Sequence, residues 1–469
     1  MYTTTVGKTF LAEYNRRNNK NYTAQLFFKE VLHPLFFGHP KYMFWPQNSP
    51  FVQMKGGQKI HILSDEERQE KLLKLEEKIV NGDRDASIAI TYPASEAKEF
   101  ATTSGAITDM DTIIEEEDVY FSWIGGCLSL GVAGGYAILF NDADITYATF
   151  EGWSVYRRYL NDPATATLPP NKIVTWNGQW ITFRLGKKYA SDFDFIALKK
   201  QGFFDVKENE IITNTVAWSK LFFSLSHQYP NAVRIAYVFA LGQTNKTIGF
   251  IPFQLQKGRR LHEIYQKLFG KEDFQANTQD FEGLFGKHIK RACELGNIGL
   301  QALEPKDLAK YFKDTSKNLN LKKTKVALKK GESTEDFENR KQKASSKEKQ
   351  NLTTFQTYKT WLTAMISKNK QEVSDYTRDI ANALVTYRGN ARRTDRKNLI
   401  EKELFATKNK GKFIEALTNI VKDDSVKMEI IEKMNELRNY IHFLNNDEFS
   451  YFILLLKFDY AFAERNSNK

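Results

Sequence analysis

The chain has 469 residues, of which 41% are hydrophobic and 13% are aromatic. This length allows about three domains with buried cores, so disorder throughout the chain is excluded. Lysine and arginine number 68 against 57 aspartate and glutamate residues, a formal charge of +11, which favours an anionic partner such as nucleic acid or a membrane surface.

The two cysteines, Cys127 and Cys293, are too few for a disulfide framework or a cysteine-rich zinc site, and no secretory signal pattern opens the sequence. We therefore expect a cytoplasmic protein. Residues 119–140 carry no charge and are long enough to cross a bilayer. Acidic residues flank both ends and glycines interrupt the run, so we predict two or three buried, strand-sized segments and no contact with a membrane.

In chain order, a helix is predicted over residues 24–32 and an aromatic loop follows it. Residues 55–59 then form a basic, glycine-containing tip whose Lys55, Gln58 and Lys59 are candidates for contact with a DNA duplex. A plain turn is the alternative. Ser64 and Glu67 have the spacing of a capping box, which predicts a helix over residues 65–81.

Residues 151–160 interleave aromatic side chains with Arg157 and Arg158, a pattern that suits a nucleic-acid surface and equally the packing of a helix. Further on, Asn177-Gly178 is the dipeptide most typical of a two-residue hairpin turn. We predict a hairpin there, whose tip presents Asn177 and Gln179 as candidate base-reading amides.

Residues 233–256 read as a second hairpin, because apolar side chains alternate along its first arm at Val233, Ile235, Tyr237, Phe239 and Leu241. Its polar tip holds the candidate DNA contacts Gln243, Asn245 and Lys246, and an ordinary surface hairpin is the alternative. Arg259 and Arg260 follow at the start of a predicted helix. Cations oppose the helix dipole there, so an anionic partner is one explanation and a solvated turn the other.

From residue 305 to residue 350 lysines accumulate and large apolar residues are few, which predicts a basic linker. Apolar positions at helical spacing then predict a bundle of four or five helices. The fold class is α+β, with an irregular mixed body over residues 1–304 that contains several antiparallel hairpins, a linker over 305–350 and a C-terminal helical bundle over 351–469. At one helix junction of the bundle Arg392, Arg393 and Arg396 are candidate phosphate contacts.

No phosphate-binding loop, nucleophile elbow, HExxH motif or Cys/His zinc pattern is present, so we predict a non-catalytic protein without cofactor or metal. Arg438 and His442 come closest to a catalytic pair. Ribonucleases of the HEPN type carry an arginine and a histidine on one helix with at least four residues between them, whereas three separate them here. A HEPN-like ribonuclease and a basic protein-binding scaffold remain the alternatives.

Four phrases, GYAILFNDADI (135–145), EGWSVYRRYL (151–160), WNGQW (176–180) and AYVFALGQTNKTIGFIPFQL (236–255), occur in a basic α+β body that precedes a helical domain. Together they resemble the large subunit of a type I CRISPR Cascade complex, most closely that of the type I-B branch. Some members of that family carry paired CxxC zinc motifs, which this chain lacks.

The resemblance implies a non-catalytic role in RNA-guided DNA recognition for antiviral defence. The body would recognise the protospacer-adjacent motif and help to open the duplex, and the C-terminal bundle would act like a small subunit along the displaced strand of the R-loop. The implied partners are a guide RNA, double-stranded target DNA, other Cascade subunits of the ribonucleoprotein and a recruited helicase-nuclease.

Overall fold

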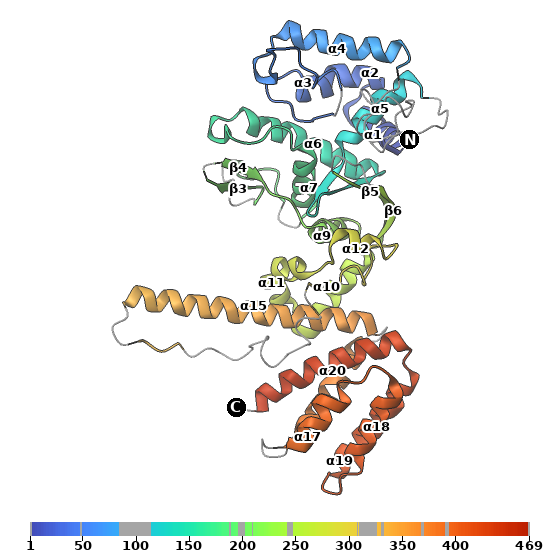
Figure 1. The fold of residues 1–469 in the computed structure, drawn as a ribbon, viewed down its shortest axis with the longest axis vertical. Helices are drawn as coiled ribbons and strands as arrows, with labels where there is room; N and C mark the ends of the chain where they lie inside the picture. Colours follow the sequence, from blue (N-terminus) through green and yellow to red (C-terminus); the bar gives the residue numbers. More distant parts are fainter. Residues whose placement is uncertain are drawn as a thin grey trace. The chain divides into compact units, whose positions relative to one another are not determined.

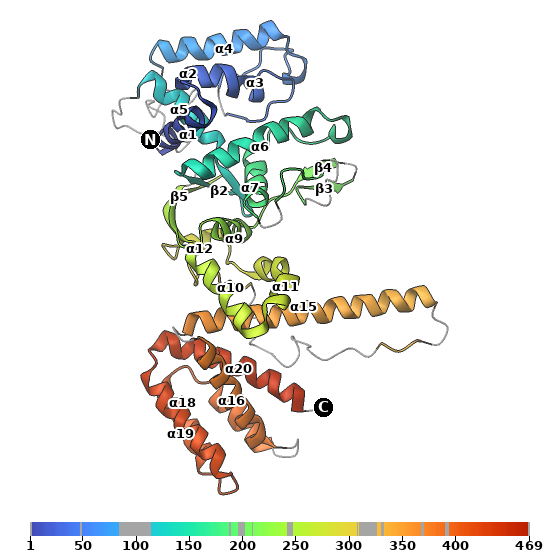
Figure 2. The ribbon, with the colours of Figure 1, turned by 180° about the vertical axis from the view of Figure 1, so that it is seen from behind.

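A computed structural model describes the backbone of most of the chain (Figures 1 and 2). The described residues are 2–46, 49–83, 114–186, 189–195, 202–208, 210–241, 247–306, 308, 326–329, 333–366, 370–389 and 394–467. They divide into two compact units, the first formed by Met1–Gln256 with His288–Gly299 and the second by Lys257–Lys287 with Leu300–Lys469.

The first unit combines helices with two small sheets. Its helices are α1 (Tyr2–Asn18), α2 (Ala24–Phe27), the π-helix η1 (Phe28–Leu32), α3 (His33–Phe36), the 3-10 helix η2 (Ile60–Ile62), α4 (Asp65–Val80), α5 (Glu116–Cys127), α6 (Ala143–Asn161), the 3-10 helix η3 (Pro163–Thr165), α7 (Ile173–Arg184), α9 (Trp218–Gln228) and α12 (Ile289–Cys293). Its strands are β1 (Leu130–Val132), β2 (Tyr136–Phe140), β3 (Phe204–Lys207), β4 (Glu210–Thr213), β5 (Val233–Ala240) and β6 (Thr247–Gln254).

The larger sheet has the strand order β1-β2-β5-β6 with antiparallel neighbours, and β3 pairs with β4 in a separate antiparallel ladder. The β5–β6 pair confirms the hairpin predicted over residues 233–256. The buried residues Ala236 and Val238 lie on one face of β5, and the residues that alternate with them along the strand lie on the opposite face. Of the five alternating apolar residues that the sequence pattern placed on one face, only Phe239 is buried; Val233, Ile235 and Leu241 are exposed.

The helix predicted from the capping box is confirmed, because the Ser64 side chain accepts from the Glu67 N–H and the Glu67 side chain accepts from the Ser64 N–H. The uncharged run over residues 119–140 is buried as expected except around the exposed turn at Gly134 and Gly135, but its first part is helix α5 and not a strand. Gly125 and Gly126 lie inside α5. A Cβ at Gly125 would come within 2.0 Å of the Thr3 carbonyl oxygen, so this glycine lets α5 and α1 pack at backbone contact.

The second unit is helical. Its elements are α10 (Gln256–Phe269), α11 (Lys271–Leu284), α15 (Thr334–Ile366), α16 (Lys370–Arg388), α17 (Thr394–Asn398), the π-helix η4 (Leu399–Leu404), α18 (Lys410–Val421), α19 (Met428–Phe443) and α20 (Asn446–Ser467). Together the two units give the predicted α+β class, with antiparallel hairpins in the first unit and helices at the C-terminus.

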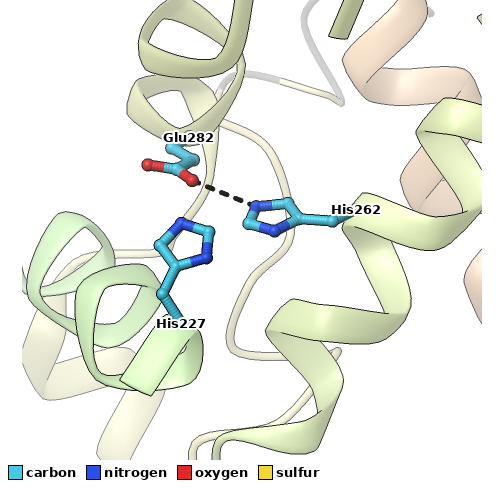
Figure 3. Close-up of side chains that lie close together, drawn as sticks. All are labelled: His227, His262 and Glu282. Carbon is cyan, nitrogen blue, oxygen red and sulfur yellow. Dashed lines mark ion pairs between the residues drawn. The ribbon is translucent and has the colours of Figure 1, made fainter. Parts of the chain in front are cut away.

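The boundaries of the two units differ from the boundaries of the predicted domains, which were 1–304, 305–350 and 351–469. Two helices before residue 304 pack with the C-terminal helices, since Tyr265 of α10 donates a hydrogen bond of 2.7 Å to Gln356 of α15. Next to it, His262 of α10 and Glu282 of α11 approach within 3.0 Å (Figure 3). His227, drawn in the same figure, lies on α9 of the first unit.

A buried ion pair joins three helices of the second unit. Lys359 of α15 donates to Asp459 of α20 at 2.8 Å, and the side chains of the two residues are only 6% and 2% exposed. The second carboxylate oxygen of Asp459 accepts a hydrogen bond of 2.7 Å from Thr377 of α16. Because each charge is desolvated, removing one partner leaves the other without compensation.

We therefore expect Asp459→Ala to lower the free energy of unfolding by about 3–5 kcal/mol, since Lys359 then stays buried without a counterion. The control is Asp375→Ala, which removes the half-exposed pair between Asp375 and Arg378 on α16 and is expected to cost less than about 1 kcal/mol. Urea unfolding of the two variants measures both values. Equal, small losses would contradict the assigned role of the buried pair.

Candidate nucleic-acid interface

The tip of the β5–β6 hairpin, residues 242–246, lies outside the described residues, so the prediction for Gln243, Asn245 and Lys246 stays a prediction. The strands that lead to it present an apolar surface. Phe250 of β6 is 57% exposed and Ile235 of β5 is 59% exposed. Tyr2 of α1 packs against this surface, with ring centroids 4.9 Å from Phe250 and 5.5 Å from Tyr237. An exposed aromatic ring such as that of Phe250 is a surface on which a nucleobase can stack.

The loop at residues 55–59 is a tight turn that is bound to α4. Gly57 has a φ of +85°, and the Gln58 N–H donates to the Lys55 carbonyl at 3.0 Å. The Gln58 amide donates to Glu67 at 2.7 Å, and Lys55 pairs with Glu70 at 3.0 Å. Two of the three predicted DNA contacts thus interact with carboxylates of α4, while Lys59 is exposed.

The hairpin predicted around Asn177-Gly178 is wrong, because residues 173–184 form helix α7. Asn177 is fully buried and donates to the carbonyls of Cys127 and Ser129 at 2.7 and 3.0 Å. Gln179 donates to the Asn214 carbonyl at 2.9 Å. These amides hold the backbone of neighbouring segments, so they do not form the predicted exposed tip.

Helix packing also explains why α7 replaces a turn. A Cβ at Gly178 would lie 2.0 Å from the Gly131 carbonyl oxygen, so the helix lies directly on strand β1. Trp176 and Trp180, on either side, are buried in the core of the first unit. The glycine that suits a turn in the sequence serves here as a point of close approach.

Arg157 and Arg158 are neighbours on α6 but lie in different environments. Arg157 is buried and donates to the carbonyl oxygens of Leu35 and Lys41. Arg158 is exposed, and its guanidinium carbon lies 3.8 Å from the centre of the Phe195 ring. Of the two, Arg158 is placed for contact with a ligand at the surface.

Arg259 and Arg260 lie near the start of α10, as predicted, and the helix begins at Gln256. Arg259 is paired with Glu263 at 2.8 Å. Arg260 donates to the Ala364 carbonyl at 2.8 Å, and burial lowers the pKa of its guanidinium. Arg260 thus takes part in packing the second unit, whereas Arg259 is an exposed side chain paired along its own helix.

Of the three arginines predicted at a helix junction, Arg392 and Arg393 lie outside the described residues. Arg396 of α17 pairs with Asp423 at 2.7 Å and donates to the Tyr387 carbonyl at 2.8 Å. Its guanidinium carbon also lies 4.5 Å from the centre of the Tyr387 ring. These contacts join α16, α17 and the loop after α18.

A run of exposed or half-buried basic side chains lies where a linker was predicted, after three acidic residues, Glu335, Asp336 and Glu338. Residues 334–350 form the N-terminal half of α15, a helix of 33 residues whose buried part begins at Thr353. Both views show this half extending past α10 and α11 (Figures 1 and 2). Between residues 339 and 352 it carries five basic side chains and one acidic side chain, Glu348; the basic residues are Arg340, Lys341, Lys343, Lys347 and Lys349. The absence of glycine and proline from residues 333–366 was a signal for this helix.

Arg438 and His442 lie one turn apart on α19, and both side chains are exposed. Arg438 donates to Asn439 at 2.7 Å.

Within the part of the chain that the structure describes, no helix combines the length and the apolar composition needed to cross a membrane. Comparisons of the chain with protein families, with curated proteins and with solved structures found no match.

The contact at Gly178 predicts that Gly178→Ala destabilises the protein strongly, because a methyl group there overlaps the Gly131 backbone. The control is Gly411→Ala in helix α18, where the nearest atom to a new Cβ is the Asn409 side-chain oxygen at 3.6 Å. That variant is expected to gain up to about 1 kcal/mol from helix propensity. Thermal unfolding of both variants makes the comparison, and a neutral Gly178→Ala would rule out the α7–β1 contact.

Proposed function

We propose that this chain is the non-catalytic large subunit of an RNA-guided DNA surveillance complex, which recognises a protospacer-adjacent motif and stabilises the opened duplex. Its partners are then a guide RNA, double-stranded target DNA, other Cascade subunits and a recruited helicase-nuclease. The observation that carries the proposal is the lysine-rich stretch of α15 at residues 340–349, whose side chains are exposed or half-buried.

A helix that extends beyond the rest of its unit and carries polar side chains on every face does not pack into a hydrophobic core along that part of its length. Residues 333–350 are exposed or half-buried throughout, and Lys343, Lys347 and Lys349 are exposed. None of these three lysines forms an ion pair within the described part of the chain. Exposed lysine side chains without an ion-pair partner attract a phosphate backbone, and this attraction depends on salt concentration but not on the nucleotide sequence.

The β5–β6 hairpin supports a second kind of contact. Its exposed ring at Phe250 lies beside Tyr237 and Tyr2, and its tip carries two amides and an ammonium group in the sequence. Stacking on the rings suits unpaired bases, while amides read base edges in a duplex. The first unit would thus read the motif, and α15 would hold the backbone.

For α15 we expect the quadruple change of Lys341, Lys343, Lys347 and Lys349 to Gln to weaken binding to duplex DNA. The slope of log affinity against log salt concentration should fall by about one for each lost phosphate contact. Fluorescence anisotropy of a labelled duplex over a salt series gives both quantities.

The matched control removes four other exposed lysines of the same unit, Lys402, Lys408, Lys412 and Lys422, also by change to Gln. If both quadruple variants lose affinity and slope equally, α15 has no special role.

Guide-independent cleavage of labelled RNA that disappears in His442→Ala would instead support the ribonuclease alternative. No DNA binding, together with failure to join a ribonucleoprotein on co-expression with guide RNA and neighbouring subunits, would support the scaffold.

For the hairpin tip, Gln243→Ala and Asn245→Ala are each expected to weaken binding to duplexes that carry the motif more than binding to random duplexes. The physical reason is that an amide that hydrogen-bonds a base edge contributes to discrimination, about 1–3 kcal/mol for a good pair. Competition binding between the two duplexes measures the ratio. An equal loss on both would remove these residues from base recognition.

A further inference from the structure

Two guanidinium groups of the first unit hold the same short backbone segment, residues 35–41. Arg157 of α6 donates through Nε to the Leu35 carbonyl and through Nη2 to the Lys41 carbonyl, each at 3.0 Å. Arg68 of α4 donates to the His39 carbonyl at 2.9 Å. The segment itself carries a further cation, because Lys41 reaches the Leu160 carbonyl at 2.6 Å. Three positive charges from distant parts of the sequence therefore meet at one place.

These charges have no anionic counterpart among the described residues. Arg68, Arg157 and Lys41 form no ion pair there; the groups that they contact are neutral backbone carbonyls and, for Arg68, the Tyr42 side chain. Arg157 is 8% exposed and Arg68 is 4% exposed. Burial lowers the pKa of Arg157 to about 10. Desolvated cations that meet only dipoles remain poorly compensated, and an anion would stabilise all of them at once.

One donor of this cluster is also unused. The Nη1 atom of Arg157 is buried and has no hydrogen-bond partner, although the other two nitrogens of the same guanidinium are bonded. A guanidinium presents five N–H donors in a rigid fork, and phosphate oxygens match that fork. The unfilled donor is therefore a second, independent sign of a missing acceptor.

His39 lies at the half-buried side of the cluster and is a neutral donor. Its Nδ1 accepts from the Lys41 N–H at 3.1 Å, which places its own proton on Nε2. Burial, followed by the charges of Arg157, Arg68 and Lys41, lowers its pKa to about 4, while a hydrogen bond with Asn161 acts in the opposite direction. A dianion beside this ring would reverse the effect of the three cations and raise the pKa.

We propose that Arg68, Arg157, Lys41 and His39 form a binding site for a phosphate group. Phosphate fits because its several acceptor oxygens can take the unused Nη1 donor of Arg157 and the ammonium of Lys41 together, and because a bond from the His39 N–H can replace the bond to Asn161. Nucleic-acid backbone and free or terminal phosphate are two sources of this same group. The site rests on its own geometry and does not depend on the proposed function or on α15.

The test measures the pKa of His39 by NMR on protein labelled at histidine, with the His39 signal assigned from His39→Gln. Inorganic phosphate is added against sodium chloride of equal ionic strength. We expect phosphate to raise the pKa by about one unit or more, as a nearby opposite charge does. Calorimetry then compares the double variant Lys41→Gln/His39→Gln, whose side chains are at the rim, with the natural chain. We expect at least about a tenfold loss of phosphate affinity, the size of one lost charge-assisted hydrogen bond.

The matched control is Lys172→Gln/His61→Gln, which removes one exposed lysine and one exposed histidine of the same unit and should leave phosphate binding unchanged. Two further ligands separate the sources: a short oligonucleotide without terminal phosphates, and a nucleoside monophosphate. A response to the oligonucleotide assigns a backbone phosphodiester, and a response to inorganic phosphate or the mononucleotide alone assigns free or terminal phosphate.

An unchanged His39 pKa with all three ligands, or equal affinities of the rim and control variants, overturns the proposal. A response to an acidic peptide without one to phosphate also overturns it, in favour of a protein partner. The quadruple lysine variant of α15 should keep the phosphate response at His39, so failure of this site and failure of the proposed function are distinguishable.

Discussion

The first unit depends on helices that pack at backbone contact. A side chain at Gly125 would overlap the Thr3 carbonyl, and one at Gly178 would overlap the Gly131 carbonyl. These two contacts set α5 against α1 and α7 against β1, and the bulky rings of Trp123, Trp176 and Trp180 fill the space around them. Interiors packed at this density have little room to relax, so the positions of the helices follow from a few glycines.

The second unit is organised by a different constraint, since its helices share a buried charge. Lys359, Asp459 and Thr377 come from three helices, and each satisfies a hydrogen-bonding group of another. Such a network stabilises one arrangement of the helices because any slip leaves a desolvated charge unpaired. The buried half of α15 is held in this way, which allows its N-terminal half, with the lysine-rich stretch, to extend without support from neighbouring helices.

The same residue type has three different roles in this chain. Arg157 holds backbone carbonyls inside the first unit, Arg396 pairs with Asp423, and Arg158 stacks on Phe195 at the surface. A run of basic residues in the sequence therefore does not identify an interface by itself. What separates the roles is whether a carboxylate, a carbonyl or only solvent lies within reach, and partners far along the chain decide that.

The sequence by itself determined the elements whose signals are local. The capping box of α4, the alternating strands of the β5–β6 hairpin, the apolar spacing of α19 and the α+β class all follow from neighbours within a few residues. It also identified the basic residues and amides from which the candidate interface was chosen. Only the tertiary structure decided that Asn177-Gly178 belongs to a buried helix, because a glycine suits a tight turn and a close helix contact equally well. It likewise brought Arg68, Arg157 and Lys41 together, since their meeting depends on the packing of α4 and α6 against one loop, which no local pattern records.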